Sequence, residues 1–246
     1  METNNFENNE IQSRLTLGEK IKYFFINPQK LFEDYLHHGK YAIPMVIVVA
    51  ISTIVAVIQG IISKEALKGA VDKQLNTTPG MDPAALGIAQ SVADVTTSPI
   101  FVAITTIVGI LIGIYFTTLI YWLVSKMFKG TASYSQMVGV YVISYFPVVI
   151  GSIIRLIYDV IVNKPIDVNA AANLSVGNVI LAKLNVFGIW QMVLLVIGIA
   201  VVAKISKKKS IGVVVIIWAL GLTFSLMSLG ATNALKGITP PSTPVP

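Results

Sequence analysis

The stretch IFVAITTIVGILIGIYFTTLIYWLV, residues 100–124, runs for 25 consecutive residues without a charged side chain. As an α-helix rising about 1.5 Å per residue it would extend over roughly 37 Å, and the hydrocarbon core of a bilayer is about 30 Å thick. A helix on the surface of a water-soluble protein needs a polar face, which this stretch lacks. The stretch therefore predicts a membrane-spanning helix.

Four further apolar blocks of comparable length flank this stretch, and none of them contains a charged residue. They cover residues 42–62, 137–154, 184–202 and 211–229. Hydrophobic residues make up 54% of the 246 positions and charged residues only 12%, about half the share found in globular domains. We therefore expect an all-α polytopic membrane protein with five transmembrane helices within residues 16–229. A disordered arm (1–15) and a proline-rich tail (230–246) are expected at its two ends.

Basic residues concentrate on one side of the five predicted spans. Eleven lysine and arginine residues lie before the first span or in the loops after the second and fourth spans, against five on the opposite side, with Arg155 and Lys183 at the span edges left out of the count. Because cytoplasmic loops carry an excess of lysine and arginine, we expect a cell-membrane protein with a cytoplasmic amino terminus and an outside carboxyl terminus. The net charge of +6 then reflects topology, and no nucleic-acid partner is expected.

The loop between the fourth and fifth spans carries the densest positive charge in the chain. Four lysines fall within six residues: Lys204, Lys207, Lys208 and Lys209. They are expected to fix the topology, because translocating them would be costly. A second hypothesis is that they bind the head groups of anionic lipids.

A helix is predicted just before the first span. Asn27 is a favourable N-cap and Pro28 suits the first helical position. The apolar residues of this helix gather on one side: Leu31, Phe32, Tyr35 and Leu36. The pattern is typical of an interfacial amphipathic helix on the inner leaflet. The alternative is that the helix packs on the inner ends of the spans as a plug.

Three features interrupt the apolar spans. Gly109 and Gly113 form a GxxxG pattern, which allows another helix to approach closely, either within this chain or in a second copy of it. Pro147 removes one backbone hydrogen bond from the third span and should kink it. Gln191 is the strongly polar side chain of the fourth span and is expected to bridge to another span.

The outer end of the predicted bundle carries a pair of opposite charges. Arg155 and Asp159 lie four residues apart, so they share one face of a helix. We interpret them as an interfacial anchor for the third span, with a buried functional cluster as the alternative. The outside loop, residues 63–98, predicts two short helices that cap the bundle.

The chain lacks the residue sets that carry out common reactions. It has no cysteine, and its two histidines, His37 and His38, point in different directions on a helix. No HExxH, GxSxG or P-loop pattern occurs. We therefore expect no catalytic, cofactor-binding or metal-binding residues and no enzymatic activity. Pro147, Gln191 and the charge pair keep a small transporter or channel as the alternative function.

Several short segments, in their order along the chain, resemble the Yip family of integral membrane proteins, and in particular its compact prokaryotic members. The segments are FINPQKLF (25–32), GTASYSQ (130–136), YFP (145–147), VFGIWQ (186–191) and KISKKKS (204–210). The resemblance covers roughly residues 20–229. The residues that carry the family pattern are Asn27, Pro28, Tyr134, Pro147, Trp190 and Gln191.

The resemblance implies an all-helical, non-enzymatic membrane protein. Eukaryotic relatives act in vesicle traffic and bind prenylated small GTPases through a cytosolic arm, but the arm of this chain is short and that partner is not carried over. We predict a multi-pass scaffold or adaptor whose inner surface engages other membrane proteins or lipids. In this interpretation Asn27 and Pro28 position the first helix, and the other four family positions pack the bundle.

Overall fold

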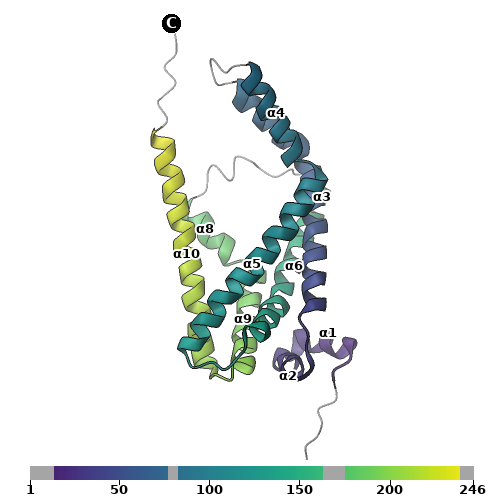
Figure 1. The fold of residues 1–246 in the computed structure, drawn as a ribbon, viewed down its shortest axis with the longest axis vertical. Coiled ribbons are helices and arrows are strands. Elements are labelled where there is room, and N and C mark those ends of the chain that lie inside the picture. Colours follow the sequence, from purple (N-terminus) through teal and green to yellow (C-terminus); the bar gives the residue numbers. More distant parts are fainter. Residues whose placement is uncertain (1–13, 77–82, 163–174, 239–246) are drawn as a thin grey trace, which may run out of the picture.

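The computed structural model describes residues 14–76, 83–162 and 175–238, and within these ranges the chain folds into helices joined by short turns (Figure 1). The elements are α1 (Leu17–Ile26), α2 (Pro28–His38), α3 (Ala42–Asn76), α4 (Pro83–Thr96), α5 (Pro99–Met127), α6 (Tyr134–Val162), α8 (Val176–Lys183), α9 (Val186–Val202) and α10 (Lys207–Ile238). Most of the predicted arm and the last residues of the predicted tail lie outside the described residues.

Four of these helices are long and apolar enough to cross a membrane: residues 42–65 of α3, all of α5, all of α6, and residues 207–231 of α10. The fourth predicted span is shorter, because α9 has 17 residues and begins only at Val186. Asn185 ends the preceding turn and caps α9, with its Oδ1 accepting from the Gly188 N–H at 2.9 Å. The prediction of an all-α polytopic membrane protein is confirmed.

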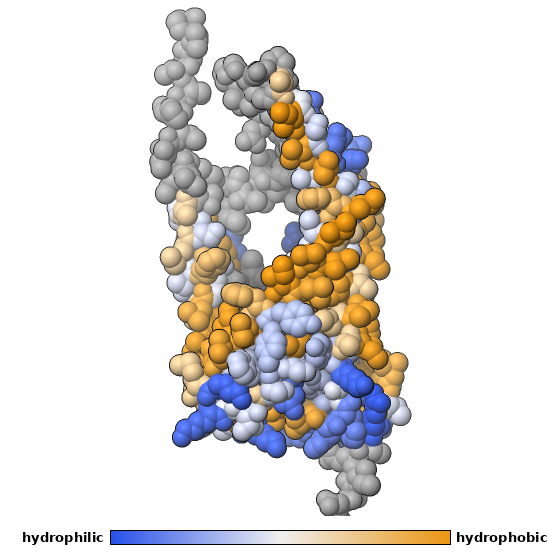
Figure 2. All heavy atoms as spheres, viewed as in Figure 1, coloured by the Kyte–Doolittle hydropathy of each residue, from blue (hydrophilic) through white to orange (hydrophobic). Residues whose placement is uncertain are grey.

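The described ends of the chain lie at opposite ends of the bundle (Figure 1). We call the end that carries α1, α2 and the turns after α5 and α9 the inner end, after the predicted topology, and the opposite end the outer end. Hydrophilic residues gather at the inner end, below a broad hydrophobic band (Figure 2). This distribution matches a bundle whose inner end lies in water and whose middle lies in lipid.

The two turns at the inner end have the same construction. In each, the residue after the helix C-cap is a lysine in the left-handed conformation, Lys129 (φ 66°) after α5 and Lys204 (φ 53°) after α9. The following amide closes a Schellman motif in both cases, as in the Gly130 N–H donating to the Ser125 carbonyl at 2.9 Å. The Thr131 N–H donates to the Ala203 carbonyl at 2.9 Å, so the turns are joined to each other.

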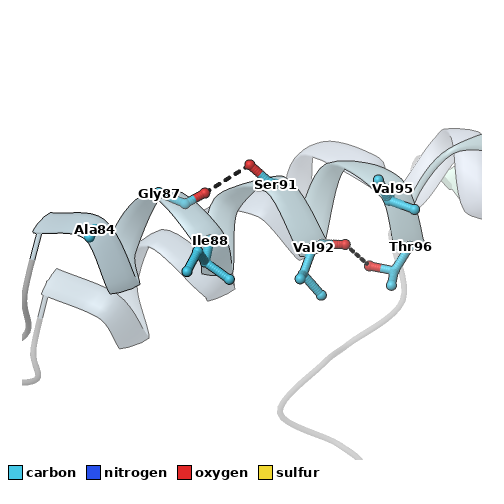
Figure 3. Close-up of a pocket in the computed structure, with 7 residues that line it drawn as sticks. All are labelled: Ala84, Gly87, Ile88, Ser91, Val92, Val95 and Thr96. Atoms are coloured by element: carbon cyan, nitrogen blue, oxygen red, sulfur yellow. Dashed lines mark hydrogen bonds between the residues drawn. The ribbon is translucent and has the colours of Figure 1, made fainter.

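The outer loop differs from its prediction. Two short capping helices were expected there; the second is present as α4, whereas the first is not separate, because α3 continues without a break to Asn76 and no proline interrupts it after the first span. α4 packs along this extension of α3, and an ion pair joins Lys68 to Asp94. One face of α4 is open and mostly apolar (Figure 3), with side chains that include Ile88, Val92 and Val95.

Candidate functional site at the inner end

α2 is packed into the inner end of the bundle, as the plug alternative describes. The Asn27 side chain accepts from the Lys30 N–H at 3.4 Å and Pro28 opens the helix. Phe32 is fully buried in the groove between α6 and α9. It fits there because Gly198 has no side chain: a Cβ at this position would lie 2.8 Å from the Phe32 ring and 2.7 Å from Val140.

A second glycine makes room for the other aromatic residue of α2. A Cβ on Gly139 would overlap the ring of Tyr35, so only glycine allows this contact with α6. The Tyr35 hydroxyl donates to the Ser135 carbonyl at 3.3 Å. Burial raises the pKa of Tyr35 to about 12, so the phenol stays protonated and remains a donor at physiological pH.

Asp34 ties α1 to α2, which the sequence pattern did not reveal. Its carboxylate is buried and accepts from the Leu15 N–H at 2.8 Å. Lys20 Nζ lies 3.0 Å from this carboxylate and His38 Nδ1 lies 3.6 Å from it. A buried carboxylate needs such partners, because desolvating an unpaired charge is expensive. The amino-terminal helices are therefore joined around one acid.

α1 has two different sides. Its own N-terminus is closed by a capping box between Thr16 and Glu19, and the hydrogen bonds from Thr16 lower the pKa of the Glu19 carboxyl. On one side the Phe24 ring lies 5.4 Å from that of Trp190. The rest of the helix surface exposes the apolar side chains of Leu17, Ile21 and Ile26; Phe25 is exposed as well, although its ring also lies 5.4 Å from that of Trp190. In this chain α1, and not α2, exposes the apolar stripe that is typical of an interfacial helix.

The four predicted lysines lie exposed at the inner end. Lys204 occupies the turn after α9, and Lys207, Lys208 and Lys209 form the first turn of α10. Positive side chains are unfavourable there, because the helix dipole is itself positive at the N-terminus. Lys126, in the last turn of α5, and Lys129, in the turn that follows it, are exposed as well. We call these six lysines the inner basic rim.

The remaining family positions lie apart from one another in the bundle. The Tyr134 hydroxyl donates to the Tyr115 carbonyl at 2.8 Å, which joins α6 to α5. Pro147 is buried inside α6. Gln191, on α9, interacts with the hydroxyl of Tyr141 on α6. These positions pack helices together and do not converge on one site.

Two other sequence features have different surroundings. A Cβ on Gly109 or Gly113 would meet no atom within 4 Å, so the GxxxG face of α5 contacts no other part of the described chain. Arg155 Nε lies 3.6 Å from Asp159 Oδ2, and the same oxygen accepts from Gln59 Nε2 at 3.3 Å. Asp159 is buried between α6 and α3, whereas the Arg155 side chain is exposed. Sequence reasoning missed Gln59, which lies a hundred positions away.

No group of three potential metal ligands occurs among the described residues.

A model of the Yip1 domain matches residues 22–229 of the chain. The membrane protein YknW of Bacillus subtilis (strain 168) is 30% identical over 139 residues, which cover 53% of this chain and 59% of YknW. The match therefore spans less than two thirds of that relative. No solved structure matches the chain.

Proposed function

The chain belongs to the Yip1 domain family, and on this premise we propose that it is a non-enzymatic scaffold or adaptor of the cell membrane. In this proposal its cytoplasmic surface engages other membrane proteins or lipids, with the amino terminus inside and the carboxyl terminus outside. The observation that carries the proposal is the construction of the inner end. Asp34 and Phe32 fix the amino-terminal helices, and Thr131 joins the two turns.

The inner basic rim is the part of this surface with the clearest chemistry. Lys207, Lys208 and Lys209 repel the positive end of the α10 dipole, so they do not stabilise the helix that carries them. Each basic residue near an anionic membrane surface contributes about 1 kcal/mol of attraction. We propose that the rim contacts anionic head groups of the inner leaflet and also fixes the topology.

Site-specific photo-crosslinking in cells tests the adaptor role. A photoreactive residue in place of Lys129 or Lys208 probes the inner end, and one in place of Ile88 on α4 is the matched control at the outer end. The proposal expects a distinct membrane protein crosslinked from both inner positions and not from Ile88. Products that contain only lipid, or the same products from all three positions, contradict an adaptor.

Substitution of Lys207, Lys208 and Lys209 by glutamine tests the lipid contact. If the purified protein retains less phosphatidylglycerol, the lipid contact is supported. If a labelling assay shows an inverted membrane topology, the role in fixing the topology is supported. Lys64→Gln, at the outer end, is the control. Unchanged topology together with unchanged lipid retention refutes both roles.

A small transporter or channel is the second candidate, and one observation favours it. Tyr141 interacts with Thr117 of α5 and Gln191 of α9, which places polar groups inside the bundle. Flux of ions or small solutes across proteoliposomes that is lost in Gln191→Leu would favour this function. Sealed proteoliposomes without such flux favour the scaffold.

A further inference from the structure

The helices pack tightly in the inner half of the bundle, but in the outer half α10 separates from α5 and α6, while α3 stays packed on both of them. α5 shows this along one face, because residues seven apart shift by only about 20° around a helix. Going outward along this face, Tyr121 is 6% exposed, Ile114 2%, Ile107 38% and Ile100 74%. The same stripe that is buried in the core therefore loses its partners toward the outer end.

α6 and α10 repeat this pattern. On α6 the residues Met137 and Ser144 are fully buried, whereas Tyr158 on the same face is exposed. On α10 the residues Ser210 and Ile217 are buried, whereas Phe224 is 75% exposed. Figure 1 shows α10 diverging from α5 and α3 toward the outer end, and Figure 2 shows a gap between them. We call this space the outer cleft.

The depth of the outer cleft fits one leaflet of a bilayer. Its floor is the layer where burial becomes complete, at Ser144 on α6. Arg155 lies eleven residues farther along the same helix, or about 16 Å at 1.5 Å per residue. Half of the hydrocarbon core is about 15 Å thick. A cleft with this depth and with apolar walls accommodates acyl chains of the outer leaflet.

Arg155 places a positive charge at the mouth of the cleft. It shares the face of α6 that carries Ser144 and Gly151, and a Cβ on Gly151 would lie 2.5 Å from the Phe187 ring near the start of α9. Arg155 therefore lies one turn beyond the N-terminus of α9, where the shorter helix no longer covers α6. Its side chain is 83% exposed.

The contacts of Arg155 leave its guanidinium available to a ligand. The ion pair with Asp159 runs through Nε at 3.6 Å, well beyond the 2.7–2.9 Å of a strong charge-assisted hydrogen bond. Among the described residues, no carboxylate other than that of Asp159 lies within 4 Å of the Arg155 guanidinium. Asp159 is held separately by Gln59. A guanidinium recognises phosphate with two parallel hydrogen bonds. The single contact between Nε and one oxygen of Asp159 does not provide such a pair of hydrogen bonds.

We propose that the outer cleft binds an anionic glycerophospholipid of the outer leaflet. Arg155 holds its phosphate at the outer interface, and its acyl chains lie against the exposed stripes of α5, α6 and α10. The positive end of the α9 helix dipole adds to the positive electrostatic potential at the phosphate. This site is separate from the inner basic rim and does not depend on the adaptor role.

The test measures lipid retention by the full-length protein, extracted in mild detergent, with native mass spectrometry. The probes are phosphatidylglycerol and phosphatidylcholine of the same chain length. The wild-type protein is expected to retain phosphatidylglycerol preferentially, and Arg155→Gln to weaken this retention about tenfold or more, since a charge-assisted hydrogen bond is lost. Arg155→Lys is expected to restore part of the preference, and Lys64→Gln, on α3 and outside both the cleft and the inner basic rim, to leave the preference unchanged.

Three results overturn the proposal: no preference between the two lipids, an equal loss in Arg155→Gln and Lys64→Gln, or retention unchanged in Arg155→Gln. A second measurement decides the matter if Arg155→Gln does not fold. Phosphatidylglycerol with a photoreactive acyl chain should crosslink to Ile107 and Phe224 of the wild-type protein more strongly than to Val46, which is exposed near the inner end of α3. Equal crosslinking at all three positions, or crosslinking of a second polypeptide at the cleft, refutes a bound lipid.

Discussion

Replacing Phe32 by alanine should release α2 from the bundle while leaving the spans folded. Phe32 is fully buried, and it fills a groove that two features shape: the missing side chain of Gly198 and the wall formed by Val140. Because α6 and α9 pack directly on each other, we expect the groove between them to stay open. The substitution therefore leaves a cavity under α2.

The size of the effect follows from what the truncation removes. Phenylalanine-to-alanine changes in protein cores cost about 3–5 kcal/mol. The undocked α2 would still rest on the bilayer, which retains part of the transfer free energy of its apolar side chains. We therefore expect the lower end of the range, about 3 kcal/mol, which raises the undocked population roughly 100-fold.

Cysteine labelling measures this population directly, because the natural chain contains no cysteine. Leu31→Cys places a thiol on the buried side of α2, and Gln29→Cys places one on its exposed side as the control. In vesicles whose inner face is accessible, Phe32→Ala should accelerate maleimide labelling at position 31 strongly and at position 29 hardly at all. An unchanged rate at position 31 would show that α2 does not depend on this contact.

Three further outcomes are expected. Lys129→Gly and Lys204→Gly should each raise the free energy of unfolding of the detergent-solubilised protein by about 1 kcal/mol, because glycine adopts the left-handed conformation without steric cost. The melting temperature should therefore rise, and a lower melting temperature contradicts this. Gly130→Val should lower the melting temperature, since its Cβ would lie 2.9 Å from the Ser125 carbonyl oxygen, and an unchanged value refutes the tight turn. Gly109→Leu with Gly113→Leu should leave the folded monomer unaffected in thermal melts, because no described residue contacts that face, and any self-association through it should weaken in crosslinking assays.

The fold was largely predictable because its signals are local. Uninterrupted apolar runs predicted the long helices, and Asn27 with Pro28 predicted the start of α2. The burial of Asp34 was not predictable, because its partners Leu15 and Lys20 lie on a different segment of the chain. Its place in the sequence, among other charged residues of the helix, indicated an exposed position instead. The short α9 could have been read from Asn185, a good N-cap that stands inside the apolar block.

The candidate site was predictable only in part, for a related physical reason. The exposed lysines of the inner basic rim follow from topology alone, so sequence reasoning identifies them. Contacts between spans depend on helix rotation and tilt, which residue spacing within one span does not determine. Gln59 beside Asp159 is one example. The outer cleft is another, because the residues of its walls are as apolar as those of the core.

The seating of α2 against α9 also constrains how the protein is made. The ribosome completes α2 at His38 and reaches Val186, the start of α9, only after about 150 more residues. At synthesis rates of about 5–20 residues per second, this interval lasts roughly 8–30 s. During it, the nascent amino-terminal segment must wait at the membrane surface without its binding groove. The capping interactions of Thr16 and Asn27 involve only residues of the same amino-terminal segment, so they can keep α1 and α2 formed until the fourth span is inserted.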